Sequence, residues 1–142
     1  KMINTIQLAS GVRFVETFYA DFLPEGNNEI VVKGLKGSDV IKRTLNYINN
    51  EQFFNLLKKI RMTFNYQDLT PKEFSNKYLR NMNNRLKPYN LTTHKLRYIA
   101  AKLAFGIFRP ELQADEIISI NKYLGHTSLN TSLAYTCLYV SE

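Results

Sequence analysis

The chain has 142 residues, of which 44% are hydrophobic and 22% charged, so we expect one folded domain with a sizeable core and exclude a disordered chain. No apolar run approaches the roughly 20 residues that span a bilayer, and no signal-peptide pattern opens the sequence. The single cysteine, Cys137, excludes an intrachain disulfide and a four-cysteine zinc site, which fits an intracellular protein of the cytoplasm, nucleoid or host cell.

The net charge is +7, from 19 lysines and arginines against 12 acidic residues. The excess is concentrated in residues 58–109, which hold twelve bases and only Asp68 and Glu73 to oppose them. Such an excess suits a polyanionic partner, because neutralising phosphates releases counterions. Solvated helix faces would give the same count, so charge alone leaves both interpretations open.

In chain order, the apolar spacing predicts a helix over residues 3–9 that breaks at Ser10 and Gly11. A second helical pattern covers residues 12–23 and ends at the turn-forming residues that follow Pro24. Residues 29–32 and 43–48 are rich in β-branched and aromatic side chains, with glycine-rich turn chemistry between them. They predict a small antiparallel hairpin.

The remaining sequence predicts helices. One covers residues 51–62, and Thr70, Pro71 and Glu73 supply an N-cap, a first-turn proline and a capping-box glutamate for the next, which runs to about residue 86. Thr93 can cap a helix that reaches residues 107–108, where Pro110 limits it. Further helices are predicted over residues 115–124 and from residue 128 or 130 to residue 140. The fold class is therefore α+β, mostly helical, in one domain.

Several polar side chains are not needed for this packing. Arg13 is placed at the first turn of the second helix, where backbone N–H groups favour an anion. Lys33 lies where the first hairpin strand enters its turn. His94 and Arg97 are three residues apart at a helix start, so both project from one face.

His126 and Tyr135 complete this set, nine residues apart. Arginines can grip the non-bridging oxygens of a phosphodiester and stabilise the charge of a pentacoordinate transition state. A tyrosine can attack the phosphorus as nucleophile, a lysine can protonate the departing 5′ oxygen, and a histidine can act as base or hydrogen-bond donor. This chemistry needs no metal and no cofactor.

Four stretches of the sequence resemble the catalytic domain of the tyrosine recombinases, the integrase family. They are "ASGVRFVET", "IVVKGLKG", "LTTHKLRYIAA" and "YLGHTSLNTSLAYT". The resemblance implies that fold for residues 1–142, as a fragment without the N-terminal DNA-clamp domain. It assigns Tyr135 as nucleophile and places the other catalytic roles on Arg13, Lys33, His94, Arg97 and His126, with Lys36 as runner-up for the lysine.

The activity implied is cleavage and rejoining of double-stranded DNA through a 3′-phosphotyrosyl link, by a protein that self-associates as a tetramer on DNA and contacts no membrane. Departures from the family pattern, among them Tyr98 after the box arginine, favour a divergent viral or mobile-element member. Glu16 is expected to orient or pack rather than react. Tyr139 is a competing phenol whose spacing from His126 does not fit.

Three alternatives stay open. Hairpin-telomere resolvases and type IB topoisomerases share the chemistry, and the nine-residue spacing after the Leu-Gly-His box favours a recombinase over a topoisomerase. A DNA-binding relative that no longer cuts would keep the basic surface and lose the adduct.

Overall fold

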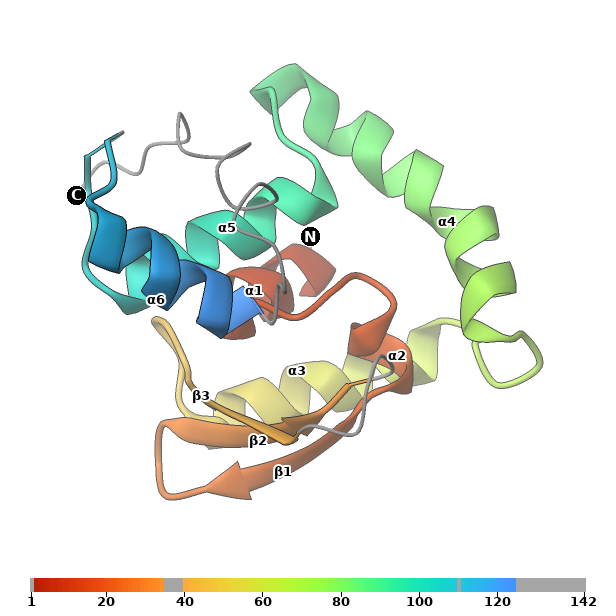
Figure 1. Cartoon of the computed structure of the whole chain (residues 1–142). Coiled ribbons are helices and arrows are strands. Elements are labelled where there is room, and N and C mark those ends of the chain that lie inside the picture. Colours follow the sequence, from red (N-terminus) through yellow and green to blue (C-terminus); the bar gives the residue numbers. More distant parts are fainter. Residues whose placement is uncertain (1, 35–39, 110, 125–142) are drawn as a thin grey trace.

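The computed structural model of the chain describes residues 2–34, 40–109 and 111–124. The helices and strands within these residues follow one another in the order shown in Figure 1. They are α1 (Met2–Ser10), α2 (Glu16–Tyr19), β1 (Asp21–Glu25), β2 (Glu29–Lys33), β3 (Val40–Thr44), α3 (Asn50–Thr63), α4 (Pro71–Leu86), the 3-10 helix η1 (Lys87–Tyr89), α5 (Thr93–Ala104) and α6 (Ala114–Leu124). The α+β prediction, mostly helical with one small antiparallel sheet, is confirmed.

The sheet has three antiparallel strands in the order β1-β2-β3. The predicted helix over residues 12–23 is wrong beyond Tyr19, because residues 21–25 form the edge strand β1, with Leu23 opposite Val31. Pairing with β2 supplies backbone hydrogen bonds that outweigh the helical spacing of the apolar residues. Pro24 fits such an edge position, since it has no N–H to donate to a neighbouring strand.

The second predicted strand, over residues 43–48, is placed too late in the chain: β3 spans Val40–Thr44, so it begins three residues earlier and ends four residues earlier. The Leu45 N–H still bonds the Asn28 carbonyl at 2.7 Å, but the chain then turns away from the sheet. Tyr47 adopts a left-handed φ of 66° in this turn. Asn46 leaves the strand direction to donate to the Leu8 and Ala100 carbonyls, which fastens the turn to α1 and α5.

Side-chain caps fix the start of three helices. Thr70 and Glu73 form the predicted capping box of α4, with Pro71 in the first turn. Asn49 and Gln52 form an equivalent box on α3. Thr92, not Thr93, caps α5 by accepting from the Lys95 N–H. Each side-chain oxygen satisfies a backbone donor that has no partner within its helix.

Helix α5 is shorter than predicted. It ends at Ala104 and does not reach residues 107–108, because Gly106 follows with a φ of 64°. A glycine in this left-handed conformation ends a helix without steric cost. The chain then returns so that Ile107 is buried, and its N–H bonds the Lys102 carbonyl at 2.9 Å.

Two apolar clusters stabilise the described residues. The larger one joins α1, α2, β2, α3 and α4, with stacked and edge-on rings of Phe14, Phe18 and Phe74 at its centre. The smaller one lies between α5 and α6, and it consists of Tyr98, Ala101, Ile107, Ile120 and Leu124, with Leu112 and Tyr123 against it. The prediction that Phe53, Phe54, Phe64, Tyr66 and Phe74 serve the core is confirmed.

The two clusters meet where α1 lies beside α5, while α4 extends along the other side of the molecule (Figure 1). No helix in the described part of the chain is long and apolar enough to cross a membrane. Helix α5 contacts both α1 and α6, so the end of α1 and the end of α6 lie close to one another beside α5.

Candidate active site

Arg13 lies in the connection that follows α1. Gly11, with a φ of 71°, turns the chain out of α1, and residues 11–15 lead to α2. The sequence predicts Arg13 in the first turn of a helix, but this is wrong, because α2 starts only at Glu16. The Glu16 carboxylate accepts from the Arg13 N–H at 2.8 Å and lies 3.8 Å from Arg13 Nη1. Glu16 is buried and thus fixes the backbone that carries the partly exposed Arg13 side chain.

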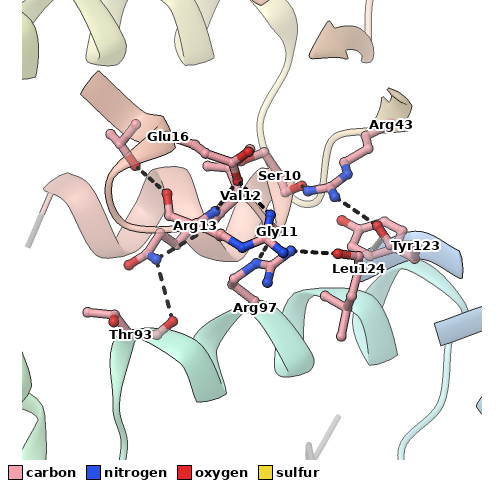
Figure 2. Close-up of polar contacts among 12 residues, drawn as sticks. Ser10, Gly11, Val12, Arg13, Glu16, Arg43, Thr93, Arg97, Tyr123 and Leu124 are labelled. Atoms are coloured by element: carbon pink, nitrogen blue, oxygen red, sulfur yellow. Dashed lines mark hydrogen bonds and ion pairs between the residues drawn. The ribbon is translucent and has the colours of Figure 1, made fainter. Parts of the chain in front are cut away.

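Arg97 lies almost completely buried on α5, with 1% of its surface exposed. Its Nε donates to the Gly11 carbonyl at 2.8 Å, and its Nη2 donates to the Leu124 carbonyl at 2.9 Å (Figure 2). Nη1 is buried and has no hydrogen-bond partner among the described residues. An unpaired guanidinium donor inside a protein is costly unless a further acceptor reaches it. Arg97 can therefore offer one donor to an anion while two others hold it in place.

Burial, followed by the nearby positive charges of Arg13 and Arg43, lowers the pKa of Arg97 to about 9, while Glu16 and Tyr123 oppose the shift. The guanidinium is still protonated at neutral pH. Three cationic groups share the neighbourhood of a single carboxylate, so the site carries a surplus of positive charge. An anion bound there would be attracted by all three arginines.

His94 reaches the same place from the first turn of α5. Arg13, His94 and Arg97 line one cavity of about 200 Å³, and Ser75 and Leu79 of α4 form its opposite wall. Desolvation, followed by the charges of Arg97 and Arg13, lowers the pKa of His94. The imidazole is therefore neutral at pH 7, and a neutral ring has one nitrogen that accepts and one that donates.

Gln7 holds the two segments of this cavity together. Its side chain is completely buried on α1, and Nε2 donates to the Val12 carbonyl at 3.3 Å and to the Thr93 carbonyl at 3.4 Å. One amide thus links the residues that immediately precede Arg13 and His94. The structure thus brings Arg13 to the same cavity as His94 and Arg97, which lie far from it in the sequence.

Lys33 is placed differently. It ends β2, is exposed, and pairs with Asp21 and Val40 in the sheet register. It does not line the cavity of Arg13, His94 and Arg97. The residue after it, Gly34, lies against Glu16, since a β-carbon there would clash with Glu16 Oε2. The strand therefore leads toward the site, although the ammonium group itself is not in it.

The other predicted residues, His126 and Tyr135, lie outside the described residues, as do Lys36, Cys137 and Tyr139. Leu124 ends α6 two residues before His126. Two residues span at most about 7 Å, so the bond from Arg97 to the Leu124 carbonyl fixes where the Leu-Gly-His segment starts. Among the described residues, no group of three or more His, Cys, Asp or Glu side chains could hold a metal ion.

Sequence reasoning missed Arg43. This β3 residue is 5% exposed and donates to the Ser10 carbonyl and to the Tyr123 carbonyl, each at 2.8 Å (Figure 2). A signal was present in the sequence, because Ile41, Arg43 and Leu45 alternate along a strand and so share one face. An arginine between two apolar residues on a core-facing row predicts a buried guanidinium, but not the groups that accept its hydrogen bonds.

We expect Gly11→Ala to lower the free energy of unfolding by about 2–4 kcal/mol, since a β-carbon would add left-handed strain and overpacking. That β-carbon would lie 2.6 Å from Cε1 of the partly buried Tyr123 ring. Gly26→Ala is the matched control, because Gly26 has a similar φ of 61° and nothing within 4 Å of the added carbon. Urea denaturation of both variants measures the difference, and equal losses would contradict the packing argument.

No protein-family model matches the sequence, and no curated protein matches it significantly. A search of solved structures finds protelomerase TelK complexed with substrate DNA, with a TM-score of 0.74 and 17% sequence identity. The fold is that of a protelomerase and tyrosine-recombinase domain. The match covers 99% of this chain and 32% of the protelomerase, so the chain spans about a third of the length of that protein. The fold predicted from the four sequence motifs is thereby confirmed.

Proposed function

We propose that this chain is a catalytic domain that cleaves and rejoins DNA by tyrosine-recombinase chemistry. The observation that carries the proposal is the convergence of Arg13, His94 and Arg97, from separate segments, on one cavity. Arg97 keeps a buried Nη1 without an acceptor among the described residues, although two backbone carbonyls already hold its other nitrogens. An anion with several oxygens, such as a phosphodiester, supplies the acceptor that this arrangement lacks.

In the proposed mechanism, Arg13 and Arg97 bind the non-bridging oxygens of the scissile phosphate, and His126 adds a third donor. These charges stabilise the transition state more than the ground state, because the phosphoryl oxygens gain negative charge as phosphorus becomes pentacoordinate. His94, neutral at pH 7, assists proton transfer at the same phosphate. The residues of the site need no metal for these steps.

The proposed nucleophile is Tyr135. Its phenolic oxygen gives its proton to a base, the role open to neutral His94, and attacks phosphorus, so that a 3′-phosphotyrosyl ester forms as the bond to the 5′ oxygen breaks. Lys33, whose ammonium group lies outside the cavity in this structure, moves toward the phosphate and gives a proton to that departing oxygen, which leaves as a 5′-hydroxyl. A 5′-hydroxyl, from the same or another strand, then attacks the ester and reverses the step, so the bond energy is conserved.

The partner we propose is double-stranded DNA, bound by self-associating protomers that form a tetramer on two duplexes. The net charge of +7 supports a polyanionic partner. The TelK structure contains that protein with its substrate DNA, which supports the same class of ligand for this fold.

The test is trapping of a covalent intermediate. A labelled pool of randomised duplexes, each nicked so that the 5′-hydroxyl fragment diffuses away, is incubated with the protein in EDTA. We expect a labelled adduct that survives denaturation and is removed by protease. Retention of the DNA in native gels without any adduct would overturn the enzyme proposal in favour of a DNA-binding relative that no longer cuts.

Hairpin-telomere resolution is the second candidate, and the protelomerase neighbour favours it. Its chemistry at phosphorus is the same, but each cut strand is joined to the complementary strand of its own duplex. Duplexes with inverted repeats distinguish the two reactions. A resolvase yields hairpin ends that renature immediately after denaturation, whereas a recombinase yields exchanged linear strands.

A further inference from the structure

Arg43 and Arg97 bind adjacent carbonyls at the ends of the same two helices. Arg43 donates to the carbonyls of Ser10, at the end of α1, and Tyr123, in the last turn of α6. Arg97 donates to the carbonyls of the residues that follow these two, Gly11 and Leu124. Figure 2 shows the two guanidinium groups between the ends of these two helices. Because the carbonyl end of a helix carries partial negative charge, cations there are stabilised.

The two arginines differ in what they can touch. Arg97 lines the cavity of the candidate active site, whereas Arg43 does not. Arg43 also lies 4.8 Å from the centre of the Tyr123 ring, so its charge is held by an aromatic face as well as by two carbonyls. Arg43 is therefore not placed to bind a phosphate in that cavity.

We propose that Arg43 is a positioning residue for the active site: by joining the ends of α1 and α6, it holds the last turn of α6, and with it the Leu124 carbonyl that Arg97 binds, in place relative to the phosphate-binding cavity. The inference rests on the proposed function, in which His126 binds the phosphate. Arg97 alone would fix Leu124 through one bond. The second bond, at Tyr123, fixes the direction of the helix end.

A purely stabilising role is a poor explanation of Arg43. Its Nε is buried without a partner among the described residues, and burial lowers its pKa. Replacing buried charged groups by apolar ones of similar volume is often neutral or stabilising. A positioning role, by contrast, requires a group that can bond two carbonyls on different helices, and the rigid fork of an arginine does this with two separate nitrogens.

The test compares Arg43→Gln with Arg61→Gln in the whole 142-residue chain. Arg61 is a matched control, since it donates to the Thr17 and Ala20 carbonyls and lies over the Phe22 ring, away from α6. Thermal unfolding shows how much stability each variant loses. Imidazole NMR then reports positioning directly, because the chain has only two histidines and His94→Asn assigns them.

In Arg43→Gln we expect the His126 signal to shift or broaden while the His94 signal stays, and neither signal should change in Arg61→Gln. We expect the single-turnover rate of adduct formation at saturating DNA to fall on the order of 10²-fold, which is the cost of a misplaced group, with little change in Kd. If Arg43→Gln does not fold, Arg43→Lys, which keeps the charge and loses one carbonyl bond, is expected to show the same His126 change.

Unchanged His126 signals, or a rate equal to that of Arg61→Gln, would overturn the positioning role even if the wild-type protein cleaves DNA. If the His126 signal moves but the wild-type protein forms no adduct, the proposed function fails and the structural role of Arg43 stands. The two failures are thus distinguishable.

Discussion

Tyr135→Phe is expected to bind the nicked duplexes as the wild-type protein does and to form no covalent adduct. The substitution removes one oxygen atom, so the charge and the arginine contacts are unchanged while the nucleophile is lost. We expect the rate to fall on the order of 10⁴-fold or more, as it does when an enzyme's nucleophile is removed. A denaturing gel measures the adduct, and a native gel measures binding.

Tyr139→Phe is the control, because Tyr139 is the neighbouring phenol four residues further along the chain. It should retain the adduct at a near wild-type rate. Tandem mass spectrometry of the nuclease-treated and protease-treated adduct should place the nucleotide on Tyr135. If Tyr139→Phe abolished the adduct and Tyr135→Phe kept it, the nine-residue spacing from His126 would have misled the assignment.

Arg97→Lys is expected to damage both cleavage and stability. Lysine cannot reproduce a fork that bonds the Gly11 and Leu124 carbonyls and still presents Nη1 to a phosphate. We expect the single-turnover rate to fall on the order of 10³-fold, and the free energy of unfolding to fall by about 3 kcal/mol. Urea denaturation and adduct kinetics at pH 7 measure the two losses separately.

Arg13→Lys separates these two roles. Among the described residues, the Arg13 side chain bonds no carbonyl, and it is 31% exposed beside the buried Glu16. Lysine keeps the positive charge that faces Glu16, so the variant should unfold like the wild-type protein. Its rate should nevertheless fall, since the phosphate loses a bidentate partner. Equal stability losses in the two variants would contradict the structural role given to Arg97.

Local signals in the sequence were sufficient for much of the fold. The capping box at Thr70 and Glu73 is formed by neighbours in the chain, and it predicted the start of α4 correctly. The apolar spacing predicts a helix over residues 12–23, but residues 21–25 form β1, because the tertiary fold brings the partner strand β2 to them. Apolar spacing cannot show such a pairing, since a strand and a short helical turn can place the same aromatic residues in one core.

The candidate site shows the same division. The box spacing indicated that His94 and Arg97 share a helix face, and both line the cavity with Arg13. Arg43 was missed because its acceptors, the Ser10 and Tyr123 carbonyls, are 33 and 80 residues away along the chain. Every residue has a backbone carbonyl, so no sequence motif can predict which carbonyls accept the hydrogen bonds of a buried arginine. Lys33, His126 and Tyr135 stay predictions.

We expect helix α6 to open before the remainder of the described chain unfolds. Its apolar residues belong to the small cluster with α5, and they are not part of the aromatic cluster around Phe18 and Phe74. Units held by few apolar contacts open at a lower free energy than the whole protein. Heat or denaturant would then abolish the activity while the spectroscopic signal of folding persists. A melting curve would therefore overstate the temperature range in which the protein is active.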